Sequence, residues 1–281
     1  MPNREHLLRD VSDTARWAAW CRSAEGDRPH PLFHDPLARR LAGARGQAIE
    51  ESMSKTRGST VNSLVVRTVA FDRLVMERIA AGGIDTVVNL AAGLDSRPYR
   101  LALPADLRWV EVDLPPLIAY KDAILADEPA ACQVERIGLD LSQTDARLAL
   151  LESIGERSTG ALVMTEGLLL YLDDALVTGL ARDLAEVPAF RTWLADLLHP
   201  ALLPIVVRSW QASDAGGEPP RFAPEGGTAY FQPFGWAERD AISAYELGES
   251  LGRPVTPTEP ATEAHREAFR IMNTYVRLDK E

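Results

Sequence analysis

The sequence predicts an α/β protein built on a doubly wound, mostly parallel sheet. From Asp85 onward, short apolar runs alternate with segments of helical length, which is typical of such a sheet. The first run leads into a glycine turn at Gly93, and Asp113 ends the second run twenty positions later. This spacing between turn and acid is typical of α/β folds that bind a nucleotide ribose.

The first 58 residues predict a helical cap on this fold. Ser12 or Asp13 can cap a first helix, and the helix-breaking segment His34-Asp35-Pro36 follows it. A longer helix is expected from Ser59 or Thr60 to residue 79, where two glycines end it.

Five apolar runs are the predicted parallel strands. They cover residues 86–92, 108–113, 133–137, 161–165 and 190–197. Ligands of such sheets bind outside the carboxyl ends of the strands, near the point where the strand order reverses. We therefore expect the functional residues directly after these runs.

Residues 200–260 follow the fifth strand as an insertion rich in proline, glycine and aromatic residues. Its aromatic residues are Trp210, Phe222, Tyr230, Phe231, Phe234 and Trp236. They could form a substrate-side wall or lid, or could anchor a surface loop to the core. Residues 261–281 are expected to add a closing strand, so that residues 1–281 form a single domain with its cofactor-binding core at 59–199.

Composition excludes several classes of function. The chain has 281 residues, of which 46% are hydrophobic and 25% charged, enough for one large core. Its net charge of −11 gives no electrostatic ground for a nucleic acid or a membrane surface as partner. Cys21 and Cys132 are too few for a disulfide framework, and no segment resembles a signal peptide or a membrane span. We expect a cytoplasmic protein.

The turn at Asn89–Arg97 predicts close approach of the backbone to a ligand. It is not the dinucleotide fingerprint, because Ala91 and Ser96 stand where that pattern needs glycine, and no phosphate-binding lysine follows. Asp113 can accept hydrogen bonds from both ribose hydroxyls. The alternatives are a purely structural turn glycine at position 93 and a solvated carboxylate at 113.

Arg67 lies among apolar residues on one face of the predicted long helix. Leu64, Phe71 and Leu74 share that face, and a desolvated guanidinium needs an anionic partner. The carboxylate of a bound amino-acid moiety would suit it. Asp72 or Glu77 could instead form a structural ion pair with it.

Polar residues also follow the third, fourth and fifth runs. Asp140 could accept from an exocyclic amine such as adenine N6, with Leu141 against the ring, or could cap the next helix. Glu166 is either a ligand-facing acid or a helix cap. Asp196 and His199 hold a similar position, where His199 could deprotonate a substrate or be structural.

Taken in order, these segments resemble the leucine carboxyl methyltransferase superfamily, and within it the bacterial branch of tetracenomycin-type polyketide carboxyl O-methyltransferases. The matching segments are TARWAA (14–19), LFHDPLA (32–38), Arg67 with Phe71 and Asp72, NLAAGLDSR (89–97), EVDLP (111–115), Asp140-Leu141 and TEGLLLYL (165–172). One departure is Ala91, where the family pattern usually has glycine.

The resemblance implies a seven-stranded class I methyltransferase (Rossmann-like) sheet with its last strand antiparallel, and S-adenosylmethionine as cofactor, with S-adenosylhomocysteine as product. The implied cofactor contacts are Arg67 to the methionyl carboxylate, Gly93 beneath it, Asp113 to the ribose, Asp140 and Leu141 to the adenine, and Glu166 near the methionyl end.

The expected reaction is methyl transfer to a carboxylate or hydroxyl oxygen of a small acidic natural product, such as an aromatic polyketide. A carboxylate needs no general base, whereas a phenol does, and His199 is the candidate base. The alternatives are an S-adenosylmethionine-binding protein without methyl transfer and a nicotinamide-dependent oxidoreductase. No metal site is expected.

Overall fold

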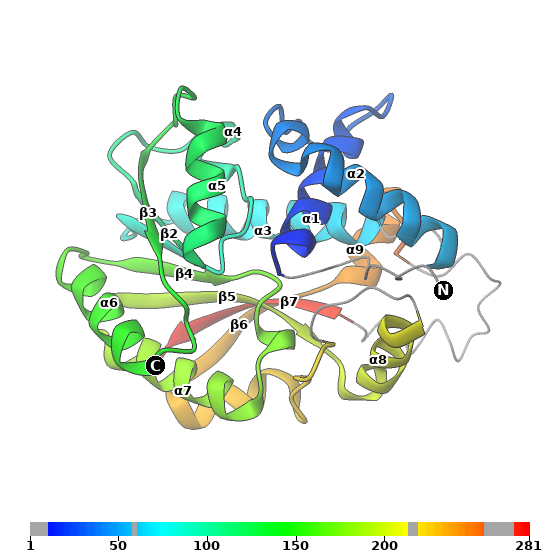
Figure 1. Cartoon of the computed structure of the whole chain (residues 1–281). Helices are drawn as coiled ribbons and strands as arrows, with labels where there is room; N and C mark the ends of the chain where they lie inside the picture. Colours follow the sequence, from blue (N-terminus) through cyan, green and yellow to red (C-terminus); the bar gives the residue numbers. More distant parts are fainter. Residues whose placement is uncertain (1–10, 58–60, 213–218, 256–272) are drawn as a thin grey trace.

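The computed structural model describes residues 11–57, 61–212, 219–255 and 273–281, and a seven-stranded sheet forms its centre (Figure 1). The strand order is β3-β2-β1-β4-β5-β7-β6. The strands are β1 (Thr86–Leu90), β2 (Arg108–Asp113), β3 (Gln133–Gly138), β4 (Ala161–Thr165), β5 (Phe190–Leu198), β6 (Trp236–Ser243) and β7 (Asn273–Lys280). Strands β1 to β5 are parallel, and β7 runs antiparallel to both of its neighbours. The predicted doubly wound α/β fold is confirmed.

The central strands are buried on both faces. Every residue of β1 and β4 is buried, which is why these segments read as continuous apolar runs and not as alternating ones. The strand order reverses between β1 and β4. Ligands of open α/β sheets bind at this position.

Helices cover both faces of the sheet (Figure 1). α3 (Val61–Ala80) and α9 (Ala244–Ser250) pack on one face, with Phe71 edge-to-face against Tyr275 of β7. α6 (Thr144–Glu156) and α7 (Asp174–Glu186) cover the other face. The remaining helices are α4 (Arg97–Arg100), α5 (Pro115–Leu125) and α8 (Leu203–Ala212), with 3-10 turns η1 (Leu169–Tyr171), η2 (Pro200–Leu202) and η3 (Gly227–Phe234).

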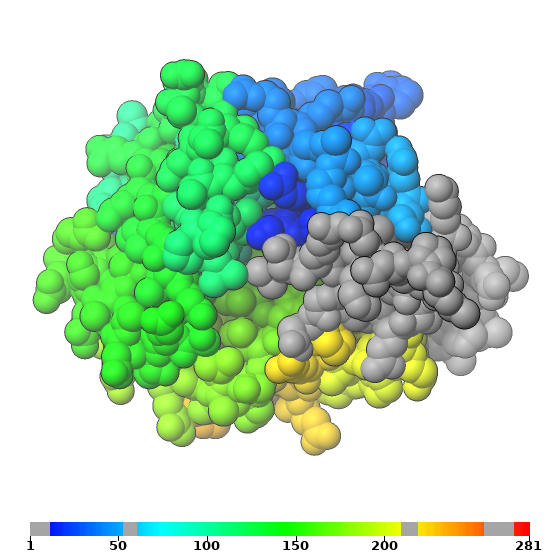
Figure 2. Space-filling model, viewed as in Figure 1, coloured from blue at the N-terminus to red at the C-terminus, as the bar shows by residue number. Residues whose placement is uncertain are grey.

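The helical cap consists of α1 (Val11–Gly26) and α2 (Ala38–Arg57), and it lies against α3 and α5. Figure 2 shows α1, in dark blue, where the cap meets the green core segments. Arg22 fastens this cap to the β1 turn: its Nε lies 2.9 Å from Asp35 Oδ2, and its Nη2 donates to the Leu94 carbonyl at 2.6 Å. Ser96 donates to the same Asp35 oxygen. The break at residues 34–36 therefore joins the cap to the core.

The described aromatic residues of the insertion pack into the core and not around a binding site. Phe222, Phe231 and Trp236 are buried, and Trp193 of β5 contacts Phe231 and Trp236 edge-to-face, at centroid distances of 5.1 and 5.6 Å. Tyr230 and Phe234 pack against the same cluster. The anchoring interpretation holds for these five residues. The side chain of Trp210 lies outside the described part of the chain.

Residues 200–281 differ from the sequence-based expectation in several places. Helix α8, strand β6 and helix α9 were not predicted, because the segment that contains them is rich in proline, glycine and aromatic residues and reads as a loop. The closing strand is β7, which begins at Asn273. Residues 256–272, where the closing strand was expected to begin, lie outside the described residues. Within the described ranges, no helix is both long enough and apolar enough to cross a membrane.

Candidate cofactor site and acceptor cavity

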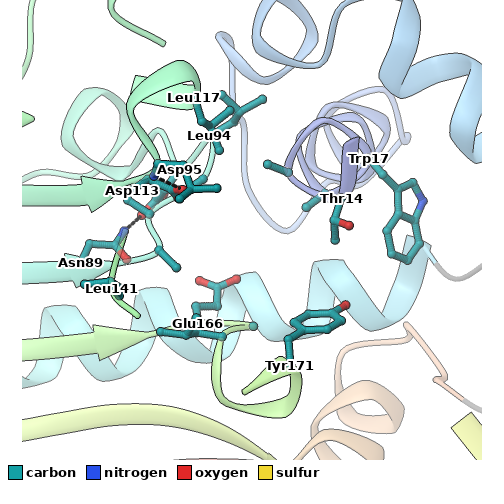
Figure 3. Close-up of a pocket in the computed structure, with 18 of the residues that line it drawn as sticks. Thr14, Trp17, Asn89, Leu94, Asp95, Asp113, Leu117, Leu141, Glu166 and Tyr171 are labelled. Carbon is teal, nitrogen blue, oxygen red and sulfur yellow. Dashed lines mark hydrogen bonds between the residues drawn. The ribbon is translucent and has the colours of Figure 1, made fainter. Parts of the chain in front are cut away.

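A cavity of about 420 Å³ lies at the carboxyl ends of β1, β2 and β4, beneath α1. Six of the seven predicted site residues line it: Arg67, Gly93, Asp113, Asp140, Leu141 and Glu166. Figure 3 shows Asn89, Asp95 and Asp113 on one side, Trp17 and Tyr171 on the other, and the Glu166 carboxylate between them. The cavity therefore has a polar end and an aromatic end.

Asp113 joins the first two strands at the polar end. Its Oδ2 accepts the Gly93 N–H at 2.7 Å and its Oδ1 accepts the Leu114 N–H at 2.7 Å. Burial raises the pKa of Asp113 above its ordinary value, although the two N–H groups act in the opposite direction. Since a carboxylate oxygen has two acceptor sites, each oxygen retains one for a ligand hydroxyl.

The β1 turn requires left-handed backbone at two positions. Gly93 has φ 51°, and Ala91, which also lines the cavity, has φ 55°. Ala91 is the only non-glycine residue with a positive φ in the described part of the chain. A left-handed alanine costs about 1–2 kcal/mol. This explains why glycine is usual at this position of the family pattern, and shows that alanine retains the turn.

Asp140 and Leu141 line the cavity beyond β3. Asp140 does not cap α6: Oδ1 accepts the Ser142 N–H at 2.9 Å, and the helix begins at Thr144 with Gln143 at the N-cap position. The capping alternative is therefore wrong. The Asp140 side chain instead stabilises the turn that carries Leu141.

Arg67 extends from α3 into the cavity, where two carboxylates hold it. Its Nε lies 3.0 Å from Glu166 Oε1, and its Nη1 lies 3.4 Å from Asp196 Oδ2. Burial by itself lowers the pKa of Arg67, but these carboxylates raise it above its ordinary value. Neither Asp72 nor Glu77 is its partner, because Asp72 binds Arg97 and Arg100 while Glu77 binds Arg73. Both structural pairs that the sequence left open are therefore wrong.

Glu166 bridges two arginines. Its second oxygen, Oε2, lies 2.8 Å from Arg97 Nη1. Burial raises the pKa of Glu166, but Arg97 and Arg67 lower it, and the net result lies below the ordinary value. Glu166 is therefore an ionised, cavity-facing acid at neutral pH and a weak base.

Sequence reasoning gave no role to Arg97, which is the centre of a buried ion network. Arg97 is 2% exposed and contacts three carboxylates: Asp72 at 2.7 Å, Asp95 at 2.9 Å and Glu166 at 2.8 Å. Its position directly after the glycine turn, at the start of α4, was the available indication. A charged residue there faces the same cavity as the turn.

The aromatic end of the cavity was also missed. It is lined by Trp17, Ala18, Leu64, Leu168, Tyr171 and Leu172. The indole of Trp17 is fixed, because its Nε1 donates to Glu50 Oε2 at 2.5 Å. Trp17 falls in a predicted helix beside Ala18, Trp20 and Cys21, and Tyr171 follows a strongly apolar run, so nothing in the local pattern set them apart from ordinary core residues.

The structure does not bring His199 into the cavity. Its Nδ1 accepts the Ala201 N–H at 3.2 Å, which makes it the N-cap of η2, and it is not among the lining residues. The proposed role of His199 as a base thus has no geometric support, and its structural alternative is favoured.

Comparison with known proteins places the chain in a family. The sequence profile of leucine carboxyl methyltransferases matches residues 15–185. A "Putative S-adenosyl-L-methionine-dependent methyltransferase" of Streptomyces coelicolor is 37% identical over 179 residues, covering 60% of this chain and 62% of that protein. Another with that description, from Streptomyces avermitilis, is 30% identical over 263 residues, covering 89% and 90%.

A solved structure from Thermobifida fusca YX, described as a "putative methyltransferase", matches this fold with a TM-score of 0.62 at 18% sequence identity. The match covers 100% of this chain and 98% of the Thermobifida chain. At this identity the likeness establishes the fold alone. The names of the relatives agree with the predicted cofactor, S-adenosylmethionine. The chain belongs to the leucine carboxyl methyltransferase family.

Proposed function

We propose that the protein is an S-adenosylmethionine-dependent O-methyltransferase that methylates a carboxylate oxygen of a small, largely apolar acid. The observation that carries this proposal is the placement of Arg67 and Glu166 in the same cavity as Asp113, with an aromatic compartment beside them. One cavity thus offers charged groups for an amino acid, an acceptor for a ribose and apolar space for a second molecule.

The residues at the polar end fit the parts of this cofactor. When bound, S-adenosylmethionine supplies a methyl group on a positively charged sulfur. Arg67 would hold the carboxylate of the amino-acid end, and ionised Glu166 would hold its ammonium group. Asp113 retains two acceptor sites for the ribose hydroxyls, and Asp140 with Leu141 would contact the adenine.

The chemistry of the lining supports a carboxylate acceptor. No histidine, lysine or cysteine is found among the described residues that line the cavity, and the lowered pKa of Glu166 makes it a poor base. A carboxylate is ionised near neutral pH without any base. Trp17, Leu64 and Leu172 line the aromatic end, and an apolar lining of this kind would favour alignment of the reacting groups in a dry site.

The bond formed in the product distinguishes carboxyl from hydroxyl transfer. We expect a hydroxyanthraquinone carboxylic acid, which offers both oxygens, to receive the labelled methyl group of S-adenosylmethionine as an ester that mild alkali cleaves. A label that survives alkali would be a phenol ether and would contradict carboxyl specificity. Tight cofactor binding without transfer to any aromatic acid would favour a binding protein.

We expect Asp113→Ala to weaken S-adenosylhomocysteine binding by about tenfold or more, because hydrogen bonds to a charged acceptor contribute roughly 1.5–3 kcal/mol. Isothermal titration measures the affinity, and the melting temperature reports the fold. Asp122→Ala on α5 is the matched control, since that carboxylate is about half exposed and pairs with Arg136 outside the cavity. Unchanged affinity in a folded Asp113 variant would remove this residue from the site.

A further inference from the structure

Asp196, at the carboxyl end of β5, contacts the site without lining the cavity. Its Oδ1 accepts the Gly167 N–H at 2.7 Å, and its Oδ2 lies 3.4 Å from Arg67 Nη1. The residue is 9% exposed and pairs across the sheet with buried Tyr275. A buried carboxylate here links the turn after β4 to the guanidinium that faces the cavity.

Gly167 brings that turn directly against Arg67. Its φ is 70°, and a Cβ at this position would lie 2.9 Å from Arg67 Nη1. Because no side chain intervenes, a movement of the Gly167 turn toward α3 would displace the guanidinium, and it would also displace the preceding Glu166. Asp196 holds both sides of this contact.

Carboxylates hold two of the three guanidinium nitrogens of Arg67, and the third remains for a ligand. Nε binds Glu166 and Nη1 binds Asp196, whereas Nη2 has no hydrogen bond to a described residue. The guanidinium is planar and rigid, so fixing two of its nitrogens fixes the direction of the third. Asp196 and Glu166 together set which edge of Arg67 remains for a ligand carboxylate.

We propose that Asp196 is a positioning residue for the amino-acid end of the cofactor, acting through Arg67 and the Gly167 turn. This inference rests on the proposed function, since it takes S-adenosylmethionine as the ligand. Asp196 does not touch the ligand; it orients the group that does.

The test compares two ligands that differ in the amino-acid end alone. S-adenosylhomocysteine carries the carboxylate, and 5′-methylthioadenosine lacks the whole amino-acid end but keeps the adenosine. In Asp196→Asn, one of the two acceptor oxygens becomes an NH₂ donor, so the side chain cannot accept from both Gly167 and Arg67. We expect the affinity for S-adenosylhomocysteine to fall by about tenfold, within the range for coupled neighbours, and that for 5′-methylthioadenosine to stay the same.

A double-mutant cycle shows whether the effect passes through Arg67. In an Arg67→Ala background, Asp196→Asn should cause a clearly smaller loss of affinity for S-adenosylhomocysteine than in the wild type, because only the contact of Asp196 with the Gly167 turn remains. The matched control is Asp279→Asn at the far end of β7, where the carboxylate likewise accepts from an arginine, Arg277, and from a neutral donor, Thr192. This control should leave both affinities unchanged.

Two results in Asp196→Asn would overturn the proposal. One is an equal loss of affinity for both ligands, which indicates a structural role, and the other is unchanged affinity for S-adenosylhomocysteine.

If Asp196→Asn does not fold, Asp196→Glu is the second variant, because it keeps the charge but moves the oxygens by one methylene. The same ligand-selective loss, smaller in size, is then expected, and its absence would count against the proposal. A wild-type protein that binds neither ligand would contradict the proposed function itself.

Discussion

Replacing Arg67 with alanine is expected to weaken S-adenosylhomocysteine binding by about a hundredfold, since truncating one partner of a buried charge pair costs roughly 2–5 kcal/mol in binding. The variant removes the cation that would meet the ligand carboxylate. It also leaves Glu166 and Asp196 beside each other without the guanidinium that now separates their charges. Isothermal titration of the folded variant measures the loss.

Arg73→Ala is the control for this prediction. Arg73 lies six residues further along α3, is about half exposed and pairs with Glu77 on the same helix. Its removal should leave the affinity unchanged, because an exposed pair contributes little. Wild-type affinity in folded Arg67→Ala would mean that the guanidinium serves the fold and not the ligand.

Replacing Arg97 with methionine is expected to lower the free energy of unfolding by about 3–5 kcal/mol, the usual cost of removing one partner of a buried ion pair. Asp72, Asp95 and Glu166 converge on this guanidinium, and Arg97 is 2% exposed. The surrounding arginines compensate only in part, because Arg100 reaches Asp72 and Arg67 reaches Glu166. Asp95 loses its closest cation.

Urea unfolding without added ligand measures this loss, so that cofactor affinity does not enter the result. Arg157→Met is the matched control: its side chain is 47% exposed and pairs with a similarly exposed Glu135, and its loss should cost less than about 1 kcal/mol. An Arg97 variant as stable as the control would show that the three carboxylates find other partners, and that the network does not stabilise the fold.

The sheet and its ligand edge could be predicted because they depend on local patterns. β2 and β4 begin and end where the apolar runs do, and residues directly after parallel strands meet at one edge whatever their separation in the chain. This rule brought Gly93, Asp113, Asp140 and Glu166 into one cavity. Strand β6 was not predicted because only its first two residues are buried, so it contains no apolar run, and its Trp236 packs against Trp193, which is distant in the sequence.

The partners of the buried charges could not be predicted for the same reason. The only protein partners that the sequence offered for Arg67 lay on its own helix, but its carboxylates lie 99 and 129 positions away. Periodicity shows that a guanidinium faces an apolar surface, whereas the topology decides which strand ends meet it. The position of His199 was predicted correctly, but its role was not. It follows β5 as expected, yet its imidazole caps η2 and does not line the cavity. A position at the end of a strand does not fix where the side chain points.

Titration of the wild-type protein with S-adenosylhomocysteine and, in parallel, with NAD is the most direct test of the cofactor site. Both ligands contain an adenosine that Asp113 and Leu141 could hold, but only the first carries an amino-acid end that Arg67 and Glu166 could hold. We expect micromolar binding of S-adenosylhomocysteine and no binding of NAD. Binding of NAD at similar affinity, or no binding of S-adenosylhomocysteine, would contradict the assignment of this cavity to the methyl-donor cofactor.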